Sequence, residues 1–84
     1  MDINVKKRDG SEEPWSYDKL VAAVTKAGIP LTAAENLASQ VQEWVKTASQ
    51  DGTILSTQVR DKLVELMKVD FPVESDNFQA YKKD

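Results

Sequence analysis

The residues of this sequence that are best suited to chemistry are the cations gathered around one tight turn. Lys6, Lys7 and Arg8 run directly into Asp9-Gly10, and a further cation, Lys19, follows. Positive groups beside a turn, with backbone amides that a ligand can approach closely, are what a phosphate chain requires. The same charges are also typical of a solvent-exposed hairpin edge, which is the simpler interpretation of these residues taken alone.

The residue types that are missing exclude several other kinds of chemistry. The chain has no cysteine and no histidine, which excludes a disulfide framework, a thiolate or imidazole zinc site and a Ser-His or Cys-His nucleophile pair. Carboxylates could still hold a hard cation, but no Asp-rich loop with ligand spacing is present. We therefore expect neither catalytic residues nor a metal site formed by the protein alone.

Size and charge narrow the class of protein further. The chain has 84 residues, 40% of them hydrophobic and 30% charged, and a net charge of −3. This composition is that of one small globular domain, and its acidity argues against a protein that binds nucleic-acid phosphates. No apolar run approaches the roughly 20 residues that span a bilayer, and the charged N-terminus is unlike a secretory signal. We expect a cytoplasmic protein that contacts no membrane.

The first part of the chain predicts a hairpin followed by a helix. Residues 3–15 flank an Asp-Gly dipeptide, a strong signal for a two-residue type I′ turn, because both central residues of that turn need positive φ. Pro14 cannot donate a ladder hydrogen bond, so we expect it at a sheet edge or at the end of its strand. Ser16 is a suitable N-cap for a helix over about 17–27, which Gly28 would end.

The second helix has the clearest start signal in the sequence. Thr32-Ala33-Ala34-Glu35 matches a capping box, in which Thr32 is the N-cap and Glu35 bonds back to it. Apolar residues then recur at helical spacing as far as Ala48. The turn-rich residues 49–52 predict the end of this helix.

The remaining elements complete an α+β order with mostly helical mass. Residues 53–57 predict a short strand or extended link, with Ser56 or Thr57 as the N-cap of a third helix. Pro72 should interrupt that helix. A last short helix is expected to turn three side chains inward: Val73, Phe78 and Tyr81. The Met and aromatic side chains lie on the apolar faces of these helices, so we expect most of them in the core.

Taken as a whole, the stretch VKKRDGSEEPWSYDKLVAAVTKAG is more informative than its parts. Its Lys-Arg-Asp-Gly, Glu-Pro-Trp and Asp-Lys-Leu steps resemble the opening of the ATP-cone domain, the nucleotide-binding regulatory module at the N-terminus of many ribonucleotide reductases. Further similarity at Pro30-Leu31, at residues 54–57 and at residues 78–82 extends the resemblance over a single domain at residues 3–83. The implied fold is a β-hairpin plus a short third strand capping a four-helix bundle. The implied ligand is ATP or dATP, with or without Mg²⁺, held between the hairpin and the helices.

The resemblance also implies which residues contact the phosphates. Lys7 and Arg8 match positions that line the phosphate chain, and Lys19 would reach it from the first helix. Ser56 and Arg60 match positions on the third helix that point toward the phosphates. These two residues are four apart, so they share one face of a helix.

Other residues would contact the base and the ribose. By resemblance, Glu13 accepts a hydrogen bond from the adenine amino group, and Val5 offers apolar contact to the base. Ser16 stands where the family more often has Asp or Asn beside the ribose, and plain N-capping is its simpler role. Trp15 leaves two roles open, since it could seal the core or form an aromatic wall for a ligand.

The leading hypothesis is a non-catalytic, allosteric ATP/dATP-binding module that acts on a protein partner or on a second copy of itself. The alternative is a helical interaction module of the same fold that has lost nucleotide binding. Nucleic-acid binding through the edge at Lys6, Lys7 and Arg8 is the weaker third hypothesis, because so few cations on an acidic domain give little affinity at physiological salt. The chain is interpreted either as a free-standing cone or as a domain cut from a longer protein.

Overall fold

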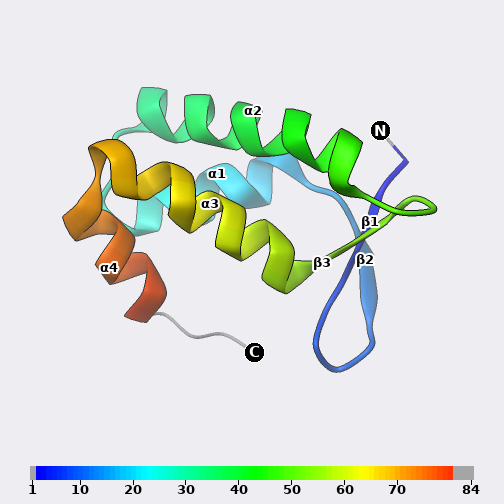
Figure 1. Ribbon diagram of the computed structural model, residues 1–84. Coiled ribbons are helices and arrows are strands. Elements are labelled where there is room, and N and C mark those ends of the chain that lie inside the picture. The colour runs from blue at the N-terminus through cyan, green and yellow to red at the C-terminus, as the bar shows by residue number, and fades with distance from the viewer. Residues whose placement is uncertain (1, 81–84) are drawn as a thin grey trace.

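The computed structural model describes residues 2–80, with a small sheet at one end of a group of helices (Figure 1). In chain order the elements are β1 (Asn4–Lys6), β2 (Glu12–Pro14), α1 (Tyr17–Lys26), α2 (Leu31–Ala48), β3 (Thr53–Leu55), α3 (Ser56–Asp70) and α4 (Pro72–Ala80). The strand order is β2-β1-β3, with β1 antiparallel to β2 and parallel to β3. The α+β class, the hairpin, the short third strand and the four helices are confirmed.

The hairpin closes through a three-residue loop instead of the predicted two-residue turn. The N–H of Lys7 donates to the carbonyl of Ser11 at 2.8 Å, and the N–H of Gly10 donates to the carbonyl of Lys7 at 3.0 Å. Gly10 has a φ of +90°, but Asp9 does not have a positive φ. A type I′ turn needs positive φ at both central residues, so that prediction is wrong. A tight turn followed by a left-handed glycine takes its place.

Asp9 stabilises this loop from within. Its carboxylate accepts hydrogen bonds from the hydroxyl of Ser11 at 2.6 Å and from the N–H of Ser11 at 2.9 Å. Hydrogen bonds to the charged form favour it, so the pKa of Asp9 is lowered from its ordinary value of 3.8, first by the Ser11 side chain and then by its backbone. The loop that carries Lys7 and Arg8 is thereby tied together by local contacts.

The helix starts agree with the sequence at α1 and differ from it at α2. Ser16 caps α1 as predicted, and its Oγ accepts from the N–H of Lys19 at 3.2 Å. The N-cap of α2 is Pro30, whose carbonyl accepts from the N–H of Ala34 at 2.8 Å. Pro30 already has the extended backbone of an N-cap, and no side-chain hydrogen bond caps this helix. Thr32 therefore lies within the first turn, and the predicted capping box is wrong.

The start of α3 also differs from the prediction by one position. Leu55 is both the last residue of β3 and the N-cap of α3, so neither Ser56 nor Thr57 is the cap. The N–H of Leu55 donates to Oε1 of Gln58 at 3.1 Å, which satisfies the N-cap amide. The hydroxyl of Ser56 is consequently not used to begin its own helix.

The core lies between the inner face of the sheet and the helices α1, α2 and α3. Its largest fully buried side chains are hydrophobic apart from Ser75, and the hydrophobic ones are Val24, Val41, Val45, Ile54, Leu63 and Met67. Both tryptophans and both phenylalanines are partly buried and pack against this cluster, as the sequence predicts for the aromatic residues. None of the helices within residues 2–80 has the length and apolar character needed to pass through a membrane.

The last helix, α4, turns one of the side chains predicted to face inward toward the core and leaves another in solvent. The inward position of Phe78 is confirmed, because it packs against the core. Val73 is 66% exposed, so its predicted inward position is wrong, and Ser75 is fully buried instead. Residues two apart on an α-helix point about 200° apart. Placing Ser75 against the interior therefore leaves Val73 in solvent. Tyr81, for which an inward position was also expected, lies outside the described residues.

Candidate functional site

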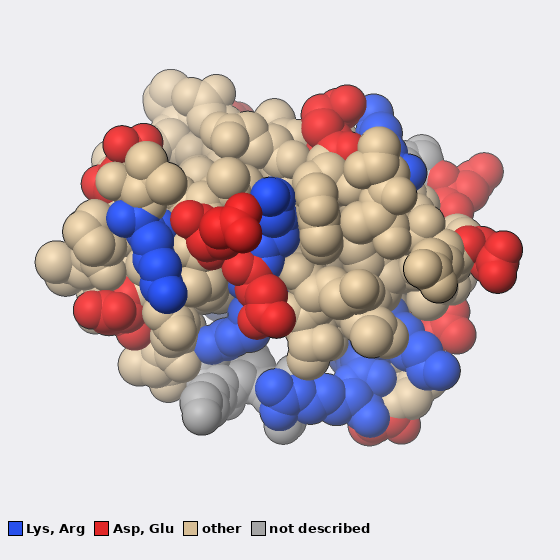
Figure 2. Space-filling model, in the orientation of Figure 1, with Lys and Arg blue, Asp and Glu red and all other residues tan. Residues whose placement is uncertain are grey.

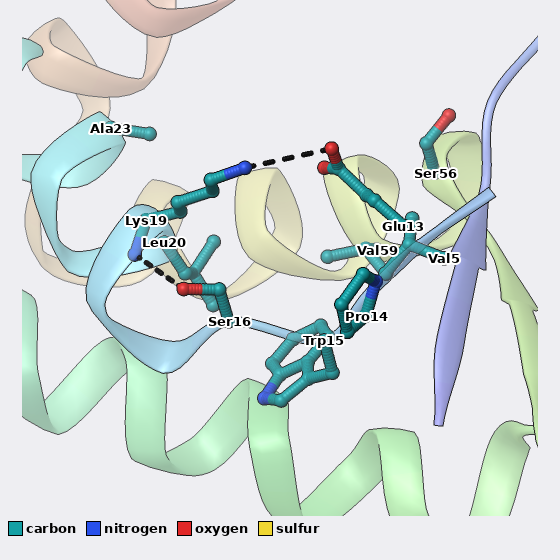
Figure 3. Close-up of a pocket in the computed structure, with 10 residues that line it drawn as sticks. All are labelled: Val5, Glu13, Pro14, Trp15, Ser16, Lys19, Leu20, Ala23, Ser56 and Val59. Atoms are coloured by element: carbon teal, nitrogen blue, oxygen red, sulfur yellow. Dashed lines mark hydrogen bonds and ion pairs between the residues drawn. The ribbon is translucent and has the colours of Figure 1, made fainter. Parts of the chain in front are cut away.

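A pocket opens where the hairpin meets the first turns of α1 and α3 (Figure 3). Its volume is about 190 Å³. The hairpin, the start of α1 and the start of α3 all contribute to its lining, which consists of Val5, Glu13, Pro14, Trp15, Ser16, Lys19, Leu20, Ala23, Ser56 and Val59. Residue 5, residues 13–23 and residues 56–59 are separate in the sequence, and they meet at this place.

Most of the residues predicted to bind a ligand lie in this lining, namely Val5, Glu13, Ser16, Lys19 and Ser56. Lys7 lies at the edge of the pocket, because its Nζ contacts the carboxylate of Glu13. Arg8 is exposed in the hairpin loop and does not belong to the lining. Arg60 is also outside it, since its guanidinium is bound to α4.

Glu13 stands between two of the predicted phosphate ligands. Its Oε2 is 3.4 Å from Nζ of Lys7 and 3.6 Å from Nζ of Lys19. The register pairs Glu13 with Val5 across the hairpin, and Lys7 lies two residues beyond Val5, so all three side chains lie on the same face. The Lys19 side chain is 73% exposed and that of Glu13 is 35% exposed. The carboxylate is therefore the more shielded member of this group.

The first turns of α1 and α3 both border the pocket, and helix N-termini favour anions. Their first backbone N–H groups have no partner within the helix, and the helix dipole places partial positive charge there. The first turn of α1 also carries the cation Lys19 and the acidic residue Asp18. Ser16 uses its oxygen to cap α1, yet its hydroxyl proton can still be donated. N-capping and contact with a ligand are therefore compatible roles.

Ser56 brings a buried hydroxyl to the same place. Within the part of the chain that the structure describes, Oγ of Ser56 is buried and forms no hydrogen bond. A buried polar group without a partner is unfavourable by about 1–3 kcal/mol. A ligand that accepted a hydrogen bond from this hydroxyl would remove that penalty.

Arg60 is engaged by the last turn of α4. Its guanidinium donates to the carbonyl of Gln79 at 3.1 Å and to that of Phe78 at 3.4 Å, and it lies 4.9 Å from the centre of the Phe78 ring. Cations are favoured at the C-terminus of a helix, where carbonyls lack partners. In this arrangement Arg60 joins α3 to α4, and it contacts the pocket only if its side chain changes position.

The sequence singled out Val5 but not the other aliphatic residues of the lining. Leu20 and Val59 pack against the core and lie near the starts of their helices, where they also border the pocket. Trp15 packs against the core, which confirms the first of the roles left open for it, and it also lines the pocket, so its second role as a wall for a ligand stays a prediction. Its Nε1 donates to Oε1 of Gln42 at 2.8 Å, which fixes the ring against α2.

The charges around the pocket differ from those of the chain as a whole. Figure 2 shows Lys and Arg side chains gathered at the lower edge of one face, where Figure 1 places the hairpin loop, while acidic side chains are scattered over the rest of that face. Within residues 2–80, no group of three acidic side chains could hold a metal ion. The site therefore combines local cations, two helix N-termini, a buried hydroxyl and an apolar wall.

Comparison with known proteins identifies the family. The family model for the ATP cone domain matches residues 3–83. The chain belongs to the ATP-cone family. This ATP-cone has the three-stranded mixed sheet and four helices consistent with the fold of its family, and the family implies regulation by ATP or dATP. No curated protein matches the chain.

Proposed function

We propose that this ATP-cone binds ATP or dATP in the pocket between the hairpin and the first turns of α1 and α3, and that it acts as a non-catalytic regulatory module. One observation carries the proposal: two helix N-termini, Lys19 and the unpartnered hydroxyl of Ser56 converge on a pocket that also has an apolar wall. These are complementary to the two unlike parts of a nucleotide, an anionic chain and an aromatic base.

The residues present fit such a ligand. Lys19, Ser56 and the helix N-termini would hold the phosphates, and Val5 would contact the base. Ligand pockets generally enclose about 300–1,000 Å³, so a pocket of about 190 Å³ would enclose part of the nucleotide only. The remainder would extend over the edge of the hairpin, toward Lys7 and Arg8. Any Mg²⁺ would be held mainly by the phosphates, because the described residues offer it no acidic cluster.

The regulatory output would pass through the elements that the nucleotide bridges. Ordering the hairpin against α1 and α3 changes the relative free energies of the conformations that these elements adopt. Arg60 extends this bridge, because it ties α3 to the end of α4. If the phosphates attract Arg60, the last turn of α4 loses its cationic cap, and the surface near the C-terminus changes with it.

A nucleotide panel tests the proposal directly. Calorimetry and thermal unfolding should be measured with ATP, dATP, GTP and CTP, each with and without Mg²⁺. Adenine nucleotides should raise the melting temperature, because a ligand at 100 times its Kd stabilises the folded state by about 2.7 kcal/mol. The absence of any shift with millimolar ATP and dATP would refute nucleotide binding by this chain.

A charge-matched pair of variants locates the binding site. Replacing Lys7 and Lys19 together by glutamine should abolish the shift, because hydrogen bonds to charged groups contribute roughly 1.5–3 kcal/mol each. The control replaces Lys6 and Lys68 by glutamine, which changes the net charge equally but leaves the pocket intact. Equal loss of binding in both variants would show that only the total charge matters.

The alternative function, a protein-interaction module without a ligand, is favoured by one feature of the surface. Val69 and Val73 flank the junction of α3 and α4 and are 77% and 66% exposed. A contiguous exposed apolar patch marks a contact with another protein or a second copy, and these two valines lie on either side of the junction in the sequence. Self-association measured by analytical ultracentrifugation with and without ATP separates the two functions, because the alternative predicts no dependence on nucleotide.

A further inference from the structure

The pair of lysines that faces the pocket is already neutralised by an anion of the protein itself. Oε2 of Glu13 lies 3.4 Å from Nζ of Lys7 and 3.6 Å from Nζ of Lys19, and Figure 3 shows the Glu13 and Lys19 side chains extended toward each other across the mouth of the pocket. A phosphate oxygen that bound both ammonium groups would need nearly the same position. The carboxylate and a phosphate carry like charges, so the two cannot share it.

We infer that Glu13 is an internal counter-ion that occupies the phosphate position of the free chain, and that ligand binding exchanges it for a phosphate. This inference rests on the proposed function. On binding, Lys7 and Lys19 pass from the carboxylate to the phosphates, and Glu13 turns toward the base. Glu13 thereby makes the phosphate site conditional on a ligand that offers the displaced carboxylate a hydrogen-bond donor.

The consequence is selection against anions that carry no such donor. Adenine has an amino group at C6, where guanine has a carbonyl oxygen, so ATP gives Glu13 a new partner when the lysines leave it. Inorganic triphosphate has no hydrogen-bond donor to offer Glu13. It would therefore leave the carboxylate beside the negative charges of the phosphates with no partner in place of the two lysines. Loss of the two exposed ion pairs costs about 0.2–1 kcal/mol each, and repulsion between the carboxylate and the phosphate oxygens adds to that cost. The device therefore discriminates against free polyphosphates, for which two lysines and two helix N-termini would otherwise be an attractive site.

The local structure explains why Glu13 is held in this place. It is the central residue of β2, paired with Val5 of β1, and so its side chain is directed to the pocket side of the sheet. Lys19 is fixed at its backbone by the cap from Ser16. The neighbouring residue Glu12 pairs with Lys6 in the same ladder and is exposed, and alternation along the strand directs its side chain to the opposite face. Glu12 therefore provides a control with the same charge on the same strand.

The test compares inorganic triphosphate binding by Glu13→Gln and Glu12→Gln variants in calorimetry at low salt. Both variants gain one unit of net charge, but only Glu13→Gln releases the two lysines. Exposed ion pairs contribute about 0.2–1 kcal/mol each, so Glu13→Gln should bind triphosphate between about twofold and thirtyfold more tightly than Glu12→Gln. Equal or weaker binding by Glu13→Gln would overturn the inference.

A second variant and a second ligand complete the experiment. Glu13→Ala should bind triphosphate as tightly as Glu13→Gln, and its preference for ATP over GTP should fall about tenfold or more, because it has no acceptor for the base. An unchanged preference would also contradict the inference. If ATP binds the unaltered chain while triphosphate binding is the same in all variants, the counter-ion role fails and the proposed function stands. If ATP fails to bind the unaltered chain, the proposed function fails first.

Discussion

Replacing Ser56 by alanine should affect the free chain and the nucleotide complex in opposite directions. In the free chain the hydroxyl is buried without a partner among the described residues, and a group of this kind is unfavourable by about 1–3 kcal/mol. Alanine removes the hydroxyl and leaves a small void, so we expect a net gain of about 0.5–1 kcal/mol. For a domain of 60–100 residues, 1 kcal/mol corresponds to about 4–8 °C in melting temperature.

The same substitution should weaken nucleotide binding. A hydrogen bond to a charged acceptor such as phosphate contributes roughly 1.5–3 kcal/mol, which corresponds to a loss of about tenfold to 150-fold in affinity for ATP. Thermal unfolding without ligand and calorimetry with ATP measure the two effects separately. A Ser56→Ala variant that is less stable than the parent and binds ATP equally well would refute the assignment of this hydroxyl to the ligand.

The chain supplies its own control for this experiment. Ser75 is the second described residue with a buried hydroxyl that lacks a partner, and it lies on α4, outside the pocket lining. Ser75→Ala should also stabilise the free chain, with a further small gain from the higher helix propensity of alanine. Its affinity for ATP should stay unchanged. A loss of affinity in both variants would indicate a general effect of the substitutions and not a direct contact.

Three further predictions concern the elements around the site. Arg60→Gln should lower the free energy of unfolding by about 1.5–3 kcal/mol through loss of its charged hydrogen bonds to α4. Amide hydrogen exchange should then accelerate more in α4 than in α2, and an equal acceleration in both helices would contradict this. Gly10→Ala should destabilise the chain by roughly 1–2 kcal/mol in denaturant unfolding, because φ is +90° there although space for a Cβ is open. The pKa of Asp9 is lowered in the folded chain, so its contribution to stability is present at pH above its ordinary value of 3.8 and is lost as the pH falls through the lower folded value. Ser11→Ala should raise the pKa of Asp9 in an NMR titration. No rise would show that the hydrogen bonds within the loop are absent in solution.

Much of the fold could be predicted because the sequence marks its own boundaries. Gly28 has a φ of +102° just after α1, as a helix-ending glycine should, and Pro14 ends an edge strand. Two of the errors concern which residue begins a helix. Pro30 and Leu55 were overlooked as N-caps because they have no side-chain acceptor, and only the backbone conformation shows that they occupy that position.

The site was predictable in its composition and less so in its contacts. Only the resemblance to a family predicted that Val5, Glu13 and Lys19 would contact the same ligand. The structure places these three residues in one pocket lining. The pairing of Glu13 with the lysines depends on strand register and on the entry angle of α1, neither of which periodicity can supply. The engagement of Arg60 depends on where α4 ends, and the prediction had already placed Val73 of that helix inward, where the structure leaves it exposed.

The position of α3 explains how a ligand in the pocket could change the position of α4. Its first turn supplies Ser56 and Val59 to the pocket lining, and the next residue, Arg60, carries the hydrogen bonds to α4. A helix transmits displacement along its axis because its backbone hydrogen bonds resist local deformation. A ligand that draws the first turn of α3 toward the hairpin must therefore either stretch the Arg60 contacts or move α4 with it. Both outcomes alter the surface around α4 without any chemical step, which is what a regulatory domain requires.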